Sequence, residues 1–205
     1  MFCRNCKKKI TIKLFSLGQL FYTGKFGKNK NSRIRKGKIS LVKCNSCGLV
    51  QLDRKFDPRY LYGKDYGYRS GINQTMTNHL SKITSKLSKF VRLNNDDQVL
   101  DIASNDGTLL NSYINKKITK IGIDPTINKF LKYYKNIDYK ISNFFSLNAF
   151  KKLKLRKKIV IVTACAVFYD LSDPNKFLND VSKILDNKRG IFYLEFQDLL
   201  SVIKN

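Results

Sequence analysis

The sequence predicts an α/β protein in which a small N-terminal zinc-binding module precedes a Rossmann-like, doubly wound parallel sheet. Two Cys-x-x-Cys pairs near the N-terminus predict the module. After Asn94, short apolar runs alternate with helical patterns, which is typical of parallel βαβ units. The first of these runs ends in a polar turn with one glycine, as expected where a parallel sheet binds a ligand.

Length and composition are compatible with one full domain and a small appendage. The 205 residues are 42% hydrophobic, which is enough for a buried core. No apolar run is long enough for a transmembrane helix, and the N-terminus shows no signal-peptide core. We therefore expect a cytoplasmic protein without a membrane partner.

The formal charge of +25 raises the question of a nucleic-acid partner. Basic residues occur in every segment, and the abundance of lysine, asparagine and isoleucine is typical of an AT-rich genome. We therefore do not expect nucleic acid as the partner, although the charge suits anionic substrates such as nucleotide sugars. The alternative is a non-enzymatic zinc-ribbon module that contacts nucleic acid, and a steep loss of affinity with salt would identify it.

The strongest motif is the pair of cysteine knuckles. Cys3, Cys6, Cys44 and Cys47 can supply four thiolates to one tetrahedral Zn²⁺. Gly48 suits the tight turn that directs backbone N–H groups at sulfur. Disulfides are the alternative, but a cytoplasmic chain disfavours them. Because protein ligands fill all four positions, we expect the zinc to be structural.

The segments after the first knuckle are less specific. Gly24–Lys38 is basic and polar, which favours a solvated loop, and Leu49–Leu52 is a short strand. The tyrosine-rich loop Tyr60–Gly71 either offers phenol groups to a polar ligand or packs a hinge. Ile72–Leu93 shows a helical apolar period, and we interpret its lone His79 as a helix-surface residue.

The organising stretch is Gln98–Leu110, read as a buried strand, a polar turn and the start of a helix. The next strand ends in Asp124, which is placed to accept hydrogen bonds from two ribose hydroxyls. The turn lacks the full G-x-G-x-x-G pattern, which argues against a dinucleotide. One glycine and several polar groups favour S-adenosylmethionine over an ordinary crossover with a polar loop.

The rest of the domain continues the alternation. The predicted strands are Gln98–Ala103, Ile118–Asp124, Ile137–Ile141, Lys158–Cys165 and Gly190–Phe196, and the predicted helices are Thr108–Lys116, Thr126–Tyr134, Leu147–Leu153 and Pro174–Asp186. We interpret Cys165 as a small buried hydrophobic residue, although its strand ends at the ligand crevice.

Taken in order, these motifs resemble a known family. The segments that carry the resemblance are the cysteine pairs, Gly48–Leu52, Tyr68–Met76, Leu100–Leu110 and Phe168–Pro174. They are similar to the zinc-binding S-adenosylmethionine-dependent methyltransferases that include the sugar C-methyltransferases. The resemblance covers the zinc module and the central domain of these proteins. It implies C-methylation of a nucleotide-linked keto-sugar, a small-molecule substrate.

The resemblance also implies roles for individual residues. It assigns the methionine part of the cofactor to Asp101, Ala103, Ser104, Asn105, Asp106 and Gly107, the ribose to Asp124, the adenine to Asn143 and Phe144, and the floor under the sulfonium to a segment ending at Cys165. Tyr66 and Tyr68 would face the sugar, and Asp170 stands near the position where sugar C-methyltransferases place a histidine. These three are the candidate catalytic residues. The family usually has glycine at the position of Ala103, where a methyl group crowds the cofactor or shifts the turn.

The predicted organisation is a zinc-binding module at 1–58, the tyrosine-rich loop and linking helix at 59–93, and a cofactor-binding domain at 94–205. The methyltransferase fold has seven strands and only five are predicted, so we expect a domain truncated after Gly190–Phe196 and inactive alone. That strand would be an apolar sheet edge, which a second polypeptide could complete. Methylation of another acceptor, including an oxygen, is the remaining alternative.

Overall fold

The computed structural model describes residues 1–22, 29–63, 66–115 and 117–204. The chain divides into two compact units. The first contains Met1–Tyr68 and Leu171–Lys176, and the second contains Arg69–Asp170 and Phe177–Asn205. Within the described ranges, no helix combines the length and apolar character that crossing a membrane requires.

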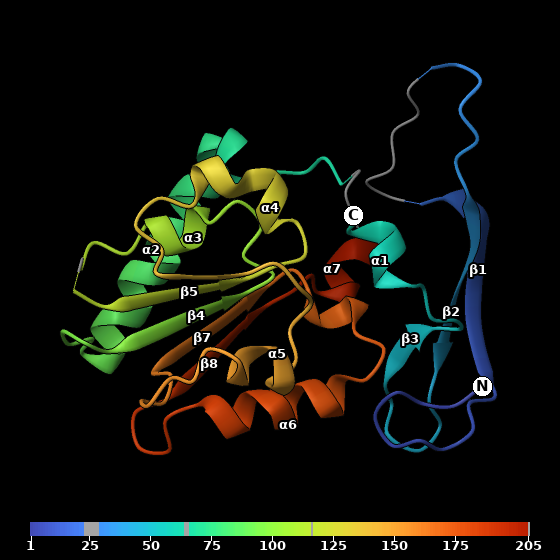
Figure 1. Ribbon diagram of the computed structural model, residues 1–205. Coiled ribbons are helices and arrows are strands. Elements are labelled where there is room, and N and C mark those ends of the chain that lie inside the picture. Colours follow the sequence, from blue (N-terminus) through green and yellow to red (C-terminus); the bar gives the residue numbers. More distant parts are fainter. Residues whose placement is uncertain (23–28, 64–65, 116, 205) are drawn as a thin grey trace. The chain divides into compact units, whose positions relative to one another are not determined.

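The first unit is built on a three-stranded antiparallel sheet. Its strands are β1 (Ile12–Phe21), β2 (Lys36–Lys43) and β3 (Val50–Leu52), in the order β1-β2-β3 (Figure 1). The short strand expected at Leu49–Leu52 is confirmed as β3. A short helix, α1 (Pro58–Leu61), follows and is capped by the Asp57 side chain.

Most of this sheet was not predicted. The expected loop Gly24–Lys38 overlaps the start of β2 at residues 36–38, while its residues 24–28 lie outside the described part of the chain. All ten residues of β1 are exposed although six of them are Ile, Leu or Phe, so burial of an apolar face does not explain the strand. It is held by backbone pairing with β2, with two register irregularities, and that pairing leaves no signal in the sequence.

The second unit contains a five-stranded parallel sheet, as predicted. Its strands are β4 (Gln98–Ile102), β5 (Thr119–Ile123), β6 (Tyr139–Ile141), β7 (Ile161–Cys165) and β8 (Ile191–Glu195). The strands lie in the order β6-β5-β4-β7-β8. The chain runs outward from the central β4 first through β5 and β6 on one side and then through β7 and β8 on the other, which is a doubly wound arrangement. All of β4 is buried, because strands lie on both sides of it and helices cover its faces.

Helices lie on both faces of this sheet. The α-helices of this unit are α2 (Gln74–Val91), α3 (Thr108–Asn111), α4 (Ile127–Phe130), α5 (Leu147–Lys151), α6 (Pro174–Ile184, whose first turn belongs to the first unit) and α7 (Leu199–Lys204), and short 3₁₀ helices cover Ser70–Ile72, Leu131–Tyr133 and Phe168–Asp170. Figure 1 shows α2, α3 and α4 on one face and α5 and α6 on the other. The predicted α/β fold class is therefore confirmed.

Two predicted helices are much shorter than expected, whereas those beginning at Leu147 and Pro174 each end two residues early. The helix at Thr108 ends at Asn111 rather than Lys116, and Lys116 itself lies outside the described residues. Ser112 gives the reason, because its hydroxyl donates to the Leu109 carbonyl and competes with continuation of the helix. The helix expected at Thr126–Tyr134 is divided between α4 and the following 3₁₀ turn.

In the longest helix, α2, the apolar residues that recur along the sequence form one buried face. Its residues Leu80, Ile83 and Leu87 recur every three or four positions and are buried against the sheet. The Asn73 side chain caps the helix by accepting from two backbone N–H groups of the first turn. The helix is thereby fixed beside α3, which begins directly after the polar turn.

Candidate cofactor site and metal centre

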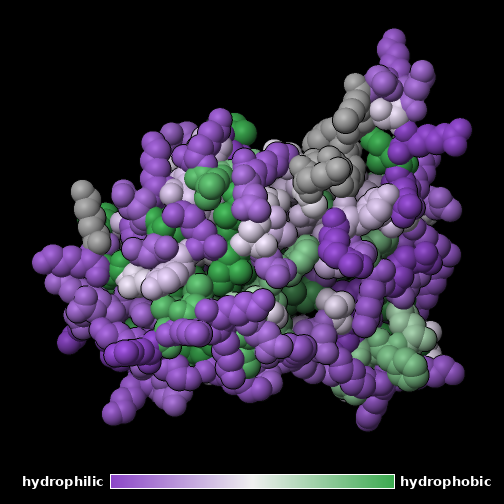
Figure 2. Space-filling view, viewed as in Figure 1, coloured by the Kyte–Doolittle hydropathy of each residue, from purple (hydrophilic) through white to green (hydrophobic). Residues whose placement is uncertain are grey.

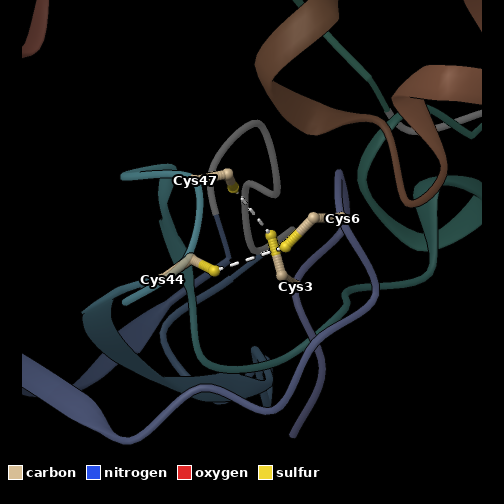
Figure 3. Close-up of side chains that lie close together, drawn as sticks. All are labelled: Cys3, Cys6, Cys44 and Cys47. Carbon is tan, nitrogen blue, oxygen red and sulfur yellow. Dashed lines mark hydrogen bonds between the residues drawn. The ribbon is translucent and has the colours of Figure 1, made fainter.

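The structure brings the four predicted metal ligands together in the first unit (Figure 3). The Sγ atoms of Cys3 and Cys47 are 3.5 Å apart, as are those of Cys6 and Cys44, and all four lie within 4.8 Å of one another. A tetrahedral zinc with Zn–S bonds of about 2.3 Å places its sulfurs roughly 3.8 Å apart. All five cysteines of the chain are free, so the disulfide alternative is not realised.

The two knuckles have the same backbone form. The N–H of Lys7 donates to the Cys3 carbonyl, and the N–H of Gly48 donates to the Cys44 carbonyl. Both Lys7 (φ 61°) and Gly48 (φ 75°) adopt the left-handed conformation that closes such a turn. A lysine therefore occupies in the first knuckle the place that glycine occupies in the second.

The electrostatics differ among the four thiols. A hydrogen bond from the backbone N–H of Leu49 lowers the pKa of the Cys47 thiol to about 6, which favours the thiolate that zinc requires, whereas burial and the neighbouring thiols raise the pKa of Cys6 to about 11. Cys3 and Cys44 are buried in a small core with Ile10 and Val42. The donor set and its geometry are those of a structural zinc site.

The candidate cofactor site lies at the carboxyl end of β4 in the second unit. Asp101 is in register with Gly122 of β5 and Thr163 of β7, so it occupies the middle of the sheet. The Thr163 hydroxyl donates to Oδ1 of Asp101 at 2.6 Å. Burial raises the pKa of Asp101 to about 7, so a cation bound at this edge would favour its ionised form.

The polar turn after β4 is held in an unusual backbone conformation. Ala103, Asn105 and Gly107 all have positive φ, at 60°, 50° and 77°. Ala103 is thus in a conformation that costs a residue with a Cβ about 1 kcal/mol, a cost that glycine would avoid. The Ser104 hydroxyl is 2.8 Å from the Tyr134 hydroxyl, and this hydrogen bond helps to fix the turn.

Asp124 follows β5 and connects to the same turn. Its Oδ2 accepts from the N–H of Asn105 at 3.0 Å, and its Oδ1 accepts from the N–H and hydroxyl of Thr126. The side chain is buried, which raises its pKa. Because Oδ2 accepts a single hydrogen bond here, it retains capacity for a ligand hydroxyl. The predicted ribose contact therefore stays a prediction.

Asp106 is engaged by the linker that precedes α2. Its Oδ2 accepts from Nε of Arg69 at 2.9 Å and from the N–H of Gly71 at 3.0 Å, while its Oδ1 accepts from the N–H and hydroxyl of Thr108. A Cβ on Gly71 would lie 2.8 Å from this carboxylate, so only glycine allows the approach. The N–H of Ser70 donates to Oδ1 of Asn105, and the linker thereby covers the turn.

Removing the Arg69 side chain is expected to destabilise the second unit by about 3 kcal/mol, because it leaves the buried Asp106 carboxylate without its charged partner. Urea unfolding of Arg69→Ala measures this loss, with the exposed Lys82→Ala on α2 as the matched control. Adding Asp106→Asn should restore part of the stability, since the uncompensated charge is then gone. A loss below 1 kcal/mol in the single variant would contradict the inferred role.

The other predicted site residues lie at separate places. Asn143 and Phe144 follow β6, and Cys165 ends β7, with burial raising the pKa of its thiol. Asp170 ends a 3₁₀ turn of the second unit. The remaining two, Tyr66 and Tyr68, belong to the first unit, where their ring centroids are 6.4 Å apart, while residues 64–65 of their loop lie outside the described part of the chain.

The structure also reveals a cluster that sequence reasoning missed. Nε2 of His79 lies 2.8 and 2.9 Å from the two carboxylate oxygens of Glu195, and the Tyr193 hydroxyl donates to the same carboxylate at 2.9 Å. A carboxylate only accepts, so the Nε2 atom carries the proton. Burial, with the Glu195 contact, raises the pKa of Tyr193 to about 12, which keeps its hydroxyl protonated at neutral pH.

This cluster lies at the carboxyl end of the sheet. Glu195 is in register with Cys165 and ends β8, two strands away from β4. Strand spacing therefore places it about 10 Å from the Asp101 strand. The prediction that His79 is only a helix-surface residue is incomplete, because 116 positions separate it from its partner and no local pattern connects them.

Comparisons with known proteins agree with the zinc module and with the family resemblance. Residues 3–62 match the Methyltransf_13 family model, described as "Putative zinc binding domain". The chain is 24% identical over 168 residues to C-methyltransferase NovU from Streptomyces niveus. This match covers 82% of this chain and 40% of that protein. It therefore spans about two fifths of the length of this curated relative.

Solved structures similar to the chain include two methyltransferases. The plantazolicin methyltransferase BpumL, solved with a desmethylPZN analogue and SAH, is 19% identical with a TM-score of 0.45, over 61% of this chain and 49% of that one. A methyltransferase from Clostridium acetobutylicum is also 19% identical, with a TM-score of 0.42 over 57% and 49%.

Proposed function

We propose that this chain is a zinc-containing, S-adenosylmethionine-dependent methyltransferase, or the part of one that binds the cofactor. The observation that carries the proposal is the carboxyl edge of the second unit's sheet. There the central β4 and the neighbouring β5 bring Asp101, the positive-φ turn and Asp124 together. The similarity to a C-methyltransferase agrees with this reading.

The residues at this edge suit the cofactor's groups. Asp101 and the turn from Ala103 to Gly107 would hold the methionine portion, Asp124 the ribose hydroxyls, and Asn143 with Phe144 the adenine. Burial at Asp101 keeps a carboxylate where a positively charged group can bind without much competing water. The bound cofactor supplies an electrophilic methyl group, and the sheet edge supplies its position.

Titration of the purified chain with S-adenosylhomocysteine tests the proposal directly. We expect saturable binding that Asp124→Ala weakens by about 2 kcal/mol, or roughly thirtyfold, because two ribose hydroxyls lose their acceptor. Asp138→Ala is the control because it removes the same negative charge from a different place. Asp138 accepts a hydrogen bond from the N–H of Lys120 at the opposite end of β5. Absence of binding by the wild-type chain would refute the cofactor assignment.

For the chemical step we propose Glu195 as the general base. Removal of a proton beside a ketone requires a carboxylate that is fixed and reachable, and His79 and Tyr193 fix this one by hydrogen bonds. Tyr66, Tyr68 and Asp170 remain proposed contributors, the tyrosines as donors to the enolate oxygen. Asp170 is the alternative base.

The acceptor that fits this chemistry best is a nucleotide-linked keto-sugar. A ketone acidifies the adjacent C–H bond, so a single carboxylate suffices to form the carbon nucleophile. The named relative is a C-methyltransferase, which agrees with transfer to carbon. Incubation with labelled cofactor and a nucleotide-linked 4-keto-sugar tests this point, and label on an oxygen would redirect the proposal to another acceptor.

A further inference from the structure

The first unit contains a cavity that adjoins the zinc centre and is separate from the cofactor site. Its empty space is about 570 Å³, in part continuous with solvent. Residues lining it include the cations Arg4, Lys7, Arg54 and Lys55 and one acid, Asp53. Four of the eleven lining residues are basic, against 40 of 205 in the whole chain, so the local positive charge exceeds the general bias of the composition.

A hydrogen-bonded framework fixes the wall of this cavity. The Arg4 guanidinium donates to the carbonyls of Leu171 at 3.3 Å and Arg54 at 2.9 Å, and its backbone N–H donates to the Gln51 side chain at 2.8 Å. These hydrogen bonds fix the Arg4 guanidinium, and because their acceptors are neutral carbonyl groups its positive charge is not neutralised. The cationic wall is therefore positioned before any ligand arrives, which lowers the entropy cost of binding.

The ion pairs at the rim leave the cavity positive. Lys7 lies 3.5 Å from Asp173, and Arg54 lies 3.2 Å from Asp53. The Lys7–Asp173 pair is largely solvent-exposed, so water screens it and it competes weakly with a multiply charged anion, whereas the Asp53 side chain is only 22% exposed and neutralises part of the Arg54 charge. Lys55, also exposed, adds a further cation to the rim.

An apolar wall adjoins these cations. Met1, Phe2 and Leu52 line the cavity, and Phe2 is 68% exposed, so its ring face is available to another ring. Clustered cations bind phosphate oxygens, and an exposed aromatic ring stacks on a base. Figure 2 shows that hydrophilic residues cover most of the visible face, with apolar residues in smaller groups among them.

We propose that this cavity binds the nucleoside diphosphate portion of the substrate, with the cations on the diphosphate and Phe2 against the base. The inference that the ligand is part of a nucleotide-linked substrate rests on the proposed function. The inference that an anion with an aromatic group binds here rests on the residues that line the cavity. The zinc module would then be a substrate-binding module, with Cys3 of the metal site among the lining residues.

Calorimetric titration of the whole chain with uridine diphosphate tests this assignment. We expect binding that Lys7→Glu combined with Lys55→Glu weakens at least tenfold. The matched control is Lys38→Glu with Lys43→Glu, two exposed lysines of β2 that change the net charge equally but do not line the cavity. The control should retain affinity within about twofold, and zinc content checks that every variant is folded.

Because Lys7 also bonds the Arg4 carbonyl, a second variant avoids the knuckle. Arg54→Gln with Lys55→Gln should weaken uridine diphosphate at least fivefold, and Phe2→Ala should weaken it but not pyrophosphate. Equal losses in the cavity and control variants, or tighter binding of a single-stranded oligonucleotide than of uridine diphosphate, would overturn the proposal. S-adenosylhomocysteine binding in the same samples reports separately on the cofactor site.

Discussion

Replacing Cys44 with serine is expected to unfold the first unit and release its zinc. The core of this unit contains four buried hydrophobic residues, and two of them, Cys3 and Cys44, are themselves candidate ligands. So small a core cannot stabilise the unit alone. Structural zinc contributes on the order of 10 kcal/mol to the folding of comparable modules, and a lost thiolate removes much of that. The β1–β2 pairing should therefore melt.

Elemental analysis and circular dichroism together check this expectation. The wild-type chain, purified without added metal, should contain close to one zinc per molecule, and Cys44→Ser should contain little. Cys165→Ser is the matched control, because it also removes a thiol but lies at the end of β7 in the second unit. A wild-type protein free of zinc whose four knuckle thiols titrate freely would disprove the structural metal.

In an assay that includes any second polypeptide needed to complete the sheet, replacing Glu195 with glutamine is expected to reduce methyl transfer by about 10²- to 10⁴-fold, the typical contribution of a positioned general base. Glutamine keeps the shape and can bond both His79 and Tyr193 but cannot take up a proton. Binding of S-adenosylhomocysteine should stay unchanged.

Two further variants separate chemistry from positioning. His79→Asn and Tyr193→Phe each weaken the hydrogen bonding that holds the carboxylate and should lower the rate by about tenfold, less than Glu195→Gln does. Asp170→Asn tests the alternative base. If that variant loses methyl transfer and Glu195→Gln does not, Asp170 takes the role proposed here for Glu195.

The sequence predicted the parts of this protein that depend on local pattern. The Cys-x-x-Cys spacing identifies the cysteine knuckles because each knuckle is a local turn whose geometry its own residues fix. The buried strands of the second unit were predicted because a central parallel strand is a continuous apolar run. Asp101 and Asp124 were found for the same reason, since each stands in or directly after such a run.

The tertiary structure alone decided the features that join distant segments. β1 carries no buried face, so its place in the sheet depends on backbone pairing with β2, which the side chains do not encode locally. The linker reaches Asp106 only once α2 has packed on the sheet, and His79 meets Glu195 across 116 positions. Contacts of this kind are set by the packing of whole elements, and neither composition nor periodicity records which elements become neighbours.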